Sequence, residues 1–115
     1  MLEAYEEYFE IAKDVLKPGA TAHDVHRAVS KGFTDRGYHL GHVTGHSIGM
    51  TMIEHPKIGE GVDTELAAGM VFSMHPHVIA ENGRDCLYMQ DTWLVTGSGG
   101  EPLSRLPMRI YDAAP

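Results

Sequence analysis

Two histidines four residues apart, His42 and His46, lie in a stretch of the chain, residues 41–50, that also holds three glycines and two small hydroxyl residues. Glycine lets the backbone bend tightly and come close to a ligand, and imidazole supplies a nitrogen ligand or carries a proton. Histidine is also abundant in this chain, with 8 in 115 residues. The stretch therefore predicts the centre of a site for metal binding or proton transfer.

Residues 69–78 predict a strand that accompanies this stretch. Side chains alternate along a strand, so His75 and His77 lie on one face while the methionines lie on the other. Pro76 has no N–H to donate to a neighbouring strand, so we expect the strand to bend there or to pair on one side.

A further strand is predicted over residues 86–96, and it places Gln90 on one of its faces. Residues 43–53 are expected to be extended, and residues 54–69 are expected to form a loop that carries a proline and two glycines. We expect the methionines to fill the core and Cys86 to be buried.

Two amphipathic helices are predicted to precede the site. Residues 2–16 carry apolar residues at three- and four-residue spacing, with glutamates off that stripe, and a Pro-Gly pair ends the pattern. Thr21 is the expected N-cap of the second helix, with Asp24 as its capping-box partner, and Gly37 is the expected C′ residue. The chain is thus expected to consist of two helices followed by strands.

The composition is that of one globular domain. A length of 115 residues is near the commonest domain size, and a formal net charge of −7 argues against nucleic acid or an anionic membrane as a partner. No apolar run approaches the roughly 20 residues that span a bilayer. The single cysteine cannot form an internal disulfide, so we expect a cytoplasmic, reducing location.

Five motifs occur in an order and spacing that resemble one family. They are KPGAT at 17–21, GHSIG at 45–49, AGMVF at 68–72, DTWLVT at 91–96 and GEPLS at 100–104. The chain is similar to the creatinase/aminopeptidase family (pita-bread, M24 peptidase-like), which includes methionine aminopeptidase, aminopeptidase P and Xaa-Pro dipeptidase. The nearest likeness is to the Xaa-Pro dipeptidase/creatinase-like branch. The resemblance implies that residues 1–115 are the C-terminal half of such a catalytic domain.

The implied fold is α+β, half of a pita-bread domain, with two helices on one face of a strongly curved, mainly antiparallel sheet. A half-domain would leave the concave side of the sheet and one edge open, and such surfaces invite pairing. We therefore expect either a homodimer, in which a twofold copy takes the place of the other half, or a longer protein whose N-terminal half is missing from this chain.

The resemblance also implies a metal site. Members of the family usually hold two divalent ions with two Asp, one His and two Glu, because carboxylates neutralise and bridge closely spaced dications. His46 stands at the position of the metal-binding His, whereas His75 and Gln90 stand where the two Glu are expected. Ile53 replaces a further catalytic imidazole, and His42 matches a substrate-side His. Both Asp would lie in the missing half.

These departures argue against a standard dinuclear aminopeptidase, because closely spaced dications without carboxylates would be buried uncompensated. Three alternatives remain open. One is a mononuclear site at His46 and His75, with His77 as a further candidate, for one divalent metal such as zinc or manganese. The second is metal-free hydrolysis, with His46 or His75 as the general acid or base. The third is an inactive pseudoenzyme or ligand-binding module.

The expected substrate is a small peptide or a related compound with a C–N bond. His46 and His75 are the predicted catalytic residues, and His42, Gln90 and His77 are the predicted substrate-binding residues. Gln90 is a poor metal ligand, but its amide can hydrogen-bond a carbonyl group.

Overall fold

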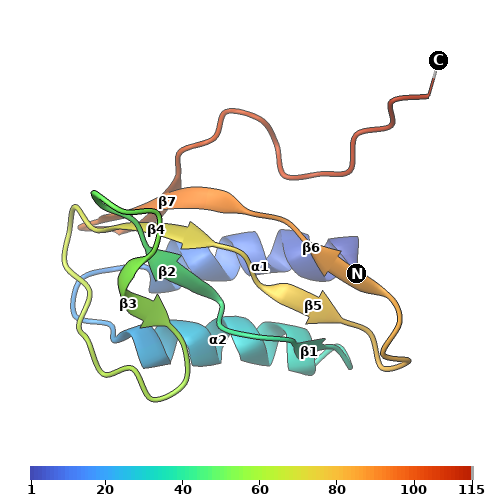
Figure 1. The fold of residues 1–115 in the computed structure, drawn as a ribbon, viewed down its shortest axis with the longest axis horizontal. Helices are drawn as coiled ribbons and strands as arrows, with labels where there is room; N and C mark the ends of the chain where they lie inside the picture. Colours follow the sequence, from blue (N-terminus) through green and yellow to red (C-terminus); the bar gives the residue numbers. More distant parts are fainter. Residues whose placement is uncertain (115) are drawn as a thin grey trace.

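Two helices open the chain and lie side by side (Figure 1). The computed structural model describes residues 1–114. Helix α1 spans Leu2–Val15 and helix α2 spans Ala22–Thr34.

Both helices were predicted from their apolar stripes. The stripe of α2 is buried as predicted at Val25, Val29 and Phe33. In α1 the buried face is shifted, because Ala4 and Tyr8 are buried together with Tyr5 and Ala12 of the predicted stripe.

The predicted capping box begins α2. Thr21 Oγ1 accepts the N–H of Asp24 (3.1 Å), and Asp24 Oδ2 accepts the N–H of Thr21 (3.2 Å). The end of the helix differs slightly from the prediction, because Asp35 is the C-cap and Gly37 lies two positions beyond it. Gly37 has a φ of +85°, which glycine adopts readily and which turns the chain toward the first strand.

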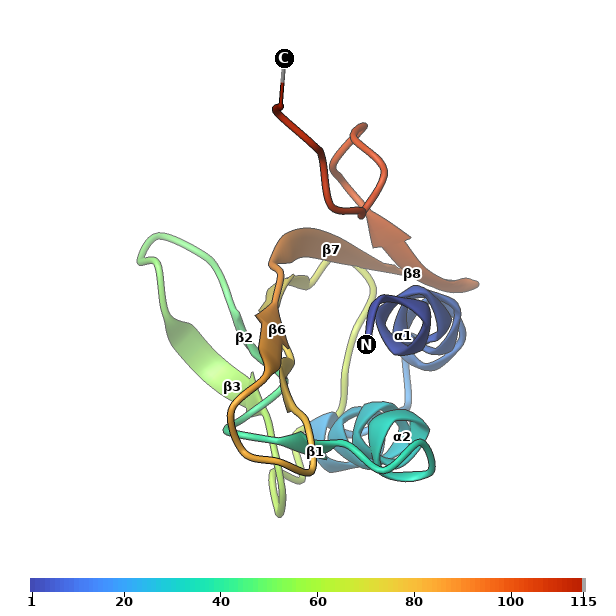
Figure 2. The ribbon, with the colours of Figure 1, turned by 90° about the vertical axis from the view of Figure 1, so that its right-hand side faces the viewer.

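Eight strands follow, and among the described residues every pairing between them is antiparallel. They are β1 (His39–Leu40), β2 (Gly45–Ser47), β3 (Glu54–Ile58), β4 (Val71–Met74), β5 (His77–Ile79), β6 (Cys86–Tyr88), β7 (Asp91–Thr96) and β8 (Gly99–Pro102). Five form a sheet in the order β3-β2-β4-β7-β8, and three form a sheet in the order β1-β5-β6. The strands curve around the two helices, with α1 beside β8 and α2 beside β1 (Figure 2). This is the predicted α+β architecture.

Two predicted strands are each divided in the structure. The first is split into β4 and β5 by His75 and Pro76, as the missing N–H of proline led us to expect. The second is split into β6 and β7 at residues 89–90. Each break changes the direction of the chain next to a predicted site residue.

The segment between β2 and β4 was predicted less well. The loop expected over residues 54–69 is wrong at its start, because β3 lies there, and residues 43–53 are a strand only within β2. In the sequence, Pro56 predicts a loop. It is tolerated in β3 because β3 is an edge strand, where some N–H groups need no partner.

The core lies between the sheets and the helices. Phe72, Met74 and Val78 have no exposed surface and belong to one apolar cluster with the inner faces of α1 and α2. Trp93 of β7 is also fully buried, and its ring centroid lies 5.0 Å from that of Phe9 in α1. The core therefore holds the helices against the side of the sheet that carries these residues.

Several residues expected in the core lie outside it. Met50 and Met52 are exposed in the segment between β2 and β3, and Cys86 is exposed in β6. These predictions are wrong because the apolar type of a residue does not tell whether its side chain packs against the core. Within residues 1–114 no helix is long and apolar enough to cross a membrane.

Gly99 brings β8 against the end of α1 and provides a matched test of this packing. Its φ is +140°, and a Cβ on it would overlap the carbonyl oxygen of Lys13, whereas Gly97 has open space around it. We expect Gly99→Ala to lower the free energy of unfolding by about 2 kcal/mol or more and Gly97→Ala to change it by less than about 1 kcal/mol. Urea unfolding measures both, and equal effects would contradict the close approach.

Candidate functional site

A cavity of about 530 Å³ opens on the side of the sheet that faces away from the core. Neighbouring residues of a strand point to opposite sides, so Ser73 faces the cavity while Phe72 and Met74 face the core. We call this cavity the histidine pocket. Its lining is His42, Val43, His46, Ile48, Met52, Ile53, Lys57, Ser73, His75, Tyr88 and Gln90.

Four imidazole rings follow one another across the histidine pocket and its rim, and we call them the imidazole row. The ring centroid of His46 lies 5.1 Å from that of His75, which lies 5.4 Å from that of His42. The centroid of His42 in turn lies 5.3 Å from that of His77. Tyr88 stands edge-on to His42, His75 and His77, at centroid distances of 5.6 to 5.7 Å. The fold thus gathers histidines from two separate segments.

Backbone carbonyl groups fix the orientation of two of these rings. His42 Nδ1 lies 2.7 Å from the carbonyl oxygen of Val43, and His46 Nδ1 lies 3.1 Å from that of Ser47. A carbonyl oxygen can only accept, so each Nδ1 carries the hydrogen of its bond. In the neutral ring the Nε2 atom then holds the free lone pair, which can bind a metal ion, accept a proton or accept a ligand N–H.

His75 is the most enclosed ring of the row. His75 is 7% exposed, and its Nδ1 atom has no hydrogen-bond partner among the described residues. Burial lowers the pKa of the His75 imidazole, and nearby His46 and His42 lower it as well, because a charged ring there would lose water and be repelled. The ring is therefore neutral at neutral pH.

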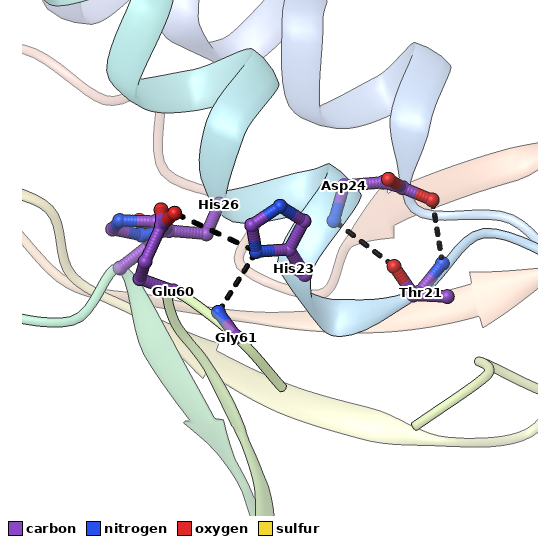
Figure 3. A network of polar contacts seen from close by, with 7 residues as sticks. Thr21, His23, Asp24, His26, Glu60 and Gly61 are labelled. Carbon is purple, nitrogen blue, oxygen red and sulfur yellow. Dashed lines mark hydrogen bonds and ion pairs between the residues drawn. The ribbon is translucent and has the colours of Figure 1, made fainter. Parts of the chain in front are cut away.

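Helix α2 supports the pocket from the core side. Thr44 is fully buried, and its Oγ1 lies 2.8 Å from His26 Nδ1. One turn earlier in α2, His23 Nδ1 accepts the N–H of Gly61 (2.8 Å) and lies 4.0 Å from the Glu60 carboxylate (Figure 3). These contacts fasten α2 to the residue before β2 and to the loop after β3.

Ser73, Gln90 and Lys57 supply further polar groups. Gln90 Nε2 donates a hydrogen bond to Ser73 Oγ, which ties the break before β7 to β4. Lys57 lies opposite His46 in the antiparallel register of β2 and β3. It is the one permanently charged residue of the lining, which contains no Asp or Glu. A pocket without acidic residues thus lies in a chain of net charge −7.

Two helices on a curved antiparallel sheet, with a histidine-bearing pocket on the open side, place the chain in the class of pita-bread domains. The model of Metallopeptidase family M24 matches residues 1–97. The chain belongs to that family.

Similar proteins include several dipeptidases. The Xaa-Pro dipeptidase of Lactobacillus delbrueckii subsp. lactis is 35% identical over 97 residues, which are 83% of this chain and 26% of that protein. The crystal structure of dipeptidase PepE from Mycobacterium ulcerans has 33% identity and a TM-score of 0.78, covering 91% of this chain and 29% of the other. The prolidase from Pyrococcus horikoshii has 26% identity and a TM-score of 0.80, covering 91% and 30%. This chain therefore spans about a quarter to a third of these relatives.

The pocket does not fit the pair of metal ions that the family resemblance implies. Two closely spaced dications need several carboxylates, and the expected Glu positions hold His75 and Gln90. Gln90 offers a neutral amide oxygen, which does not neutralise the charge of a cation as a carboxylate does. In residues 1–114 no three His, Cys, Asp or Glu side chains form a group that could hold a metal ion. A dinuclear mechanism therefore has no support in the side chains of this chain.

Four of the five predicted site residues line the pocket, namely His42, His46, His75 and Gln90. His77 lies on the rim beside His42 and Tyr88. The roles of all five stay predictions. Sequence reasoning missed Lys57, because its segment was expected to be a loop. The available signal was the alternation of polar and apolar residues in β3, which matches its alternating burial. Sequence reasoning also missed Tyr88, whose place on the same strand face as Gln90 was the available signal.

The contact between His26 and Thr44 predicts a pH dependence of stability. Burial lowers the pKa of His26 in the folded state. The neutral His26 side chain therefore contributes its full stabilisation above the ordinary histidine pKa of about 6.5. That stabilisation is lost as the pH falls through the lower pKa of the folded state. We expect the free energy of unfolding to fall as the pH drops below about 6.5, the ordinary histidine value. His26→Gln should reduce this slope, and His39→Gln, at an exposed position, should not. Equal slopes in all three proteins would contradict the burial of His26.

Proposed function

We propose that this chain is the C-terminal half of an Xaa-Pro dipeptidase-like catalytic domain, and that its histidine pocket binds a short peptide or a related small compound with a C–N bond. One observation carries the proposal. The lining offers a cation, neutral imidazole nitrogens and an amide, and it contains no carboxylate.

A short peptide complements these groups. Its carboxylate would pair with the ammonium of Lys57, and the N–H groups of its terminal ammonium would donate to Nε2 of His42 and His46. The apolar side of the pocket, which includes Ile48 and Ile53, would contact a ligand side chain. Charge and hydrogen bonding thus favour a ligand with one carboxylate and one terminal ammonium group.

The names of the relatives agree with this ligand class, since they are called Xaa-Pro dipeptidase, dipeptidase and prolidase. The chain spans less than a third of each. In our proposal the rest of the catalytic machinery lies outside this chain, which by itself binds the ligand without rapid hydrolysis.

The second candidate function is metal-free hydrolysis, and the orientation of His46 favours it. The Nδ1–H of His46 is held by the carbonyl group of Ser47, which leaves Nε2 free to accept a proton from an attacking water molecule. His75, neutral and enclosed beside it, would be the companion acid or base. This reaction needs no carboxylate from the pocket.

One NMR titration separates binding from hydrolysis. We expect an Xaa-Pro dipeptide to shift the resonances of pocket residues, with no free proline released by the chain alone. Lys57→Met should weaken binding about fivefold or more, because a charge-assisted contact is lost, whereas Lys57→Arg should retain it. The dipeptide amide, which lacks the carboxylate, should bind both variants alike.

Two results would contradict the proposal. If the dipeptide leaves the pocket resonances unshifted, the ligand class is wrong. In a separate incubation of the chain, hydrolysis of the dipeptide would release free proline, and hydrolysis of creatine would release free sarcosine. If either product accumulates and His46→Ala abolishes its release, metal-free hydrolysis is the correct function. His75→Ala serves as the second control in that case.

We also propose that the open side of the sheet is covered by a partner, for which a second copy of this chain is our first candidate. Edge strand β3 and the exposed side chains of Met50, Met52 and Ile53 lie on or beside the pocket. Light scattering at micromolar concentration should give twice the chain mass of 12.6 kDa. A mass of 12.6 kDa would remove the second copy and leave an N-terminal segment as the covering element.

A further inference from the structure

We propose that Tyr5 is a positioning residue of the histidine pocket, and that its hydroxyl group holds open the break between strands at which His75 faces Gln90. The placement of these two side chains is a property of the free chain. Its effect on ligand affinity rests on the peptide-binding function proposed above. Tyr5 is buried on the core side of the sheet, so it acts on a ligand only through the strands that it contacts.

The strand register shows that the two breaks lie opposite each other. β4 pairs antiparallel with the first four residues of β7, and β5 pairs antiparallel with β6. Two residues separate the paired strands on each side, 75–76 on one and 89–90 on the other. The same register therefore runs through both breaks, with no residue inserted on either side.

This register defines two opposed pairs of residues within the break. His75 lies opposite Gln90, and Pro76 lies opposite Met89. Side chains alternate along a strand, and His75 and Gln90 both line the pocket, whereas Met89 packs against the core. The break thus presents one pair of polar side chains to the ligand.

The hydroxyl group of Tyr5 takes the place of the ladder hydrogen bonds between Pro76 and Met89. Its oxygen accepts the N–H of Met89 (3.1 Å), and it lies 2.6 Å from the carbonyl oxygen of Pro76 and 2.8 Å from that of Met89. A hydroxyl group has one hydrogen, so it donates to one of these two carbonyl groups at a time. Three backbone groups from two strands thus meet at one side-chain atom of α1.

Proline explains why this position needs a hydroxyl group. Pro76 has no N–H, so the carbonyl group of Met89 finds no ladder donor on the opposite strand. A buried carbonyl group without a partner costs free energy, and the Tyr5 hydroxyl supplies a donor from the helix instead. Among the described residues no direct hydrogen bond joins Pro76 and Met89, so the ladder stays open here.

The core fixes the position and the protonation state of Tyr5. The residue has no exposed surface, and its ring centroid lies 5.2 Å from that of Tyr8 and 5.7 Å from that of Phe33. Burial raises the pKa of the Tyr5 hydroxyl well above its ordinary value, because the phenolate would lose its hydration. The group therefore keeps its proton and stays a donor throughout the neutral pH range.

Both pocket residues of the break are held through their backbone neighbours. The N–H of His75 donates to the carbonyl group of Thr44, and the next carbonyl group along the chain meets the Tyr5 hydroxyl. Gln90 directly follows the residue whose N–H donates to Tyr5. Loss of the hydroxyl group would free the backbone on one side of each residue and change the way His75 and Gln90 face a ligand.

The variant Tyr5→Phe tests the proposal, because it removes the hydroxyl group and keeps the ring. In NMR spectra of the free chain we expect the His75 ring and Gln90 side-chain amide resonances to move, and we expect the affinity for an Xaa-Pro dipeptide to fall about threefold or more. Tyr8→Phe is the matched control. It removes the hydroxyl group of another buried tyrosine of α1 that takes no part in these hydrogen bonds, so it should change neither quantity.

A measurement on the unaltered chain makes the test independent of how Tyr5→Phe folds. The hydroxyl proton of Tyr5 is enclosed and hydrogen-bonded, so it should exchange slowly with water. It should also give a nuclear Overhauser contact to the N–H of Met89.

Three results would overturn the inference. The first is the absence of that contact in the unaltered chain. The second is a folded Tyr5→Phe variant with unchanged His75 and Gln90 resonances and unchanged dipeptide affinity. The third is the same set of changes in Tyr8→Phe, which would reduce Tyr5 to a part of the core. If the unaltered chain does not bind the dipeptide, the proposed function fails, whereas the resonances of the free chain still decide the role of Tyr5.

Discussion

The hydrogen bond from the backbone N–H of His75 to the carbonyl group of Thr44 (2.8 Å) is the contact on which the pocket depends. It joins the end of β4 to the start of β2 at the point where Pro76 ends the strand. The two histidine segments meet there, so the rings of His46 and His75 become neighbours. From the core side, His26 holds the buried hydroxyl of Thr44. Thr44 therefore links the backbone of His75 to helix α2.

The glycines of residues 41–50 serve this same junction. A Cβ on Gly45 would overlap the carbonyl oxygen of Ser73, and one on Gly41 would lie 2.6 Å from His77 Nδ1. A Cβ on Gly49 would overlap the carboxylate of Glu54. The sequence suggested that these glycines allow the close approach of a ligand. In the structure they allow neighbouring strands and side chains to approach the segment that carries His42 and His46, which is how the rings come together.

Local signals in the sequence predicted the parts of the fold that depend on local physics. The apolar periodicity of α1 and α2 is written along each helix, and it predicted both helices correctly. The capping box at Thr21 needs contacts only within one helix turn, and it was confirmed. Strand β3 was missed because its formation depends on pairing with β2 at an edge, where Pro56 is harmless. Four lining histidine and glutamine positions followed from the family pattern. Lys57 did not, because its place opposite His46 is a property of the register between β2 and β3.

The distribution of charge gives the pocket its chemical character. Acidic side chains are numerous in the chain, and Glu3 and Glu7 of α1 face Arg36 at the molecular surface. None of them lines the pocket, where the imidazole of His75 and the amide of Gln90 occupy the positions at which the family resemblance predicts carboxylates. A site built in this way offers imidazole nitrogens and a single cation, which suit a peptide carboxylate better than a pair of hard dications.

The most direct test is an anomalous diffraction experiment on crystals soaked with manganese. Our account predicts no manganese pair in the histidine pocket, because its lining among the described residues contains no carboxylate. Two manganese ions in the pocket, about 3.5 to 4 Å apart, would contradict it.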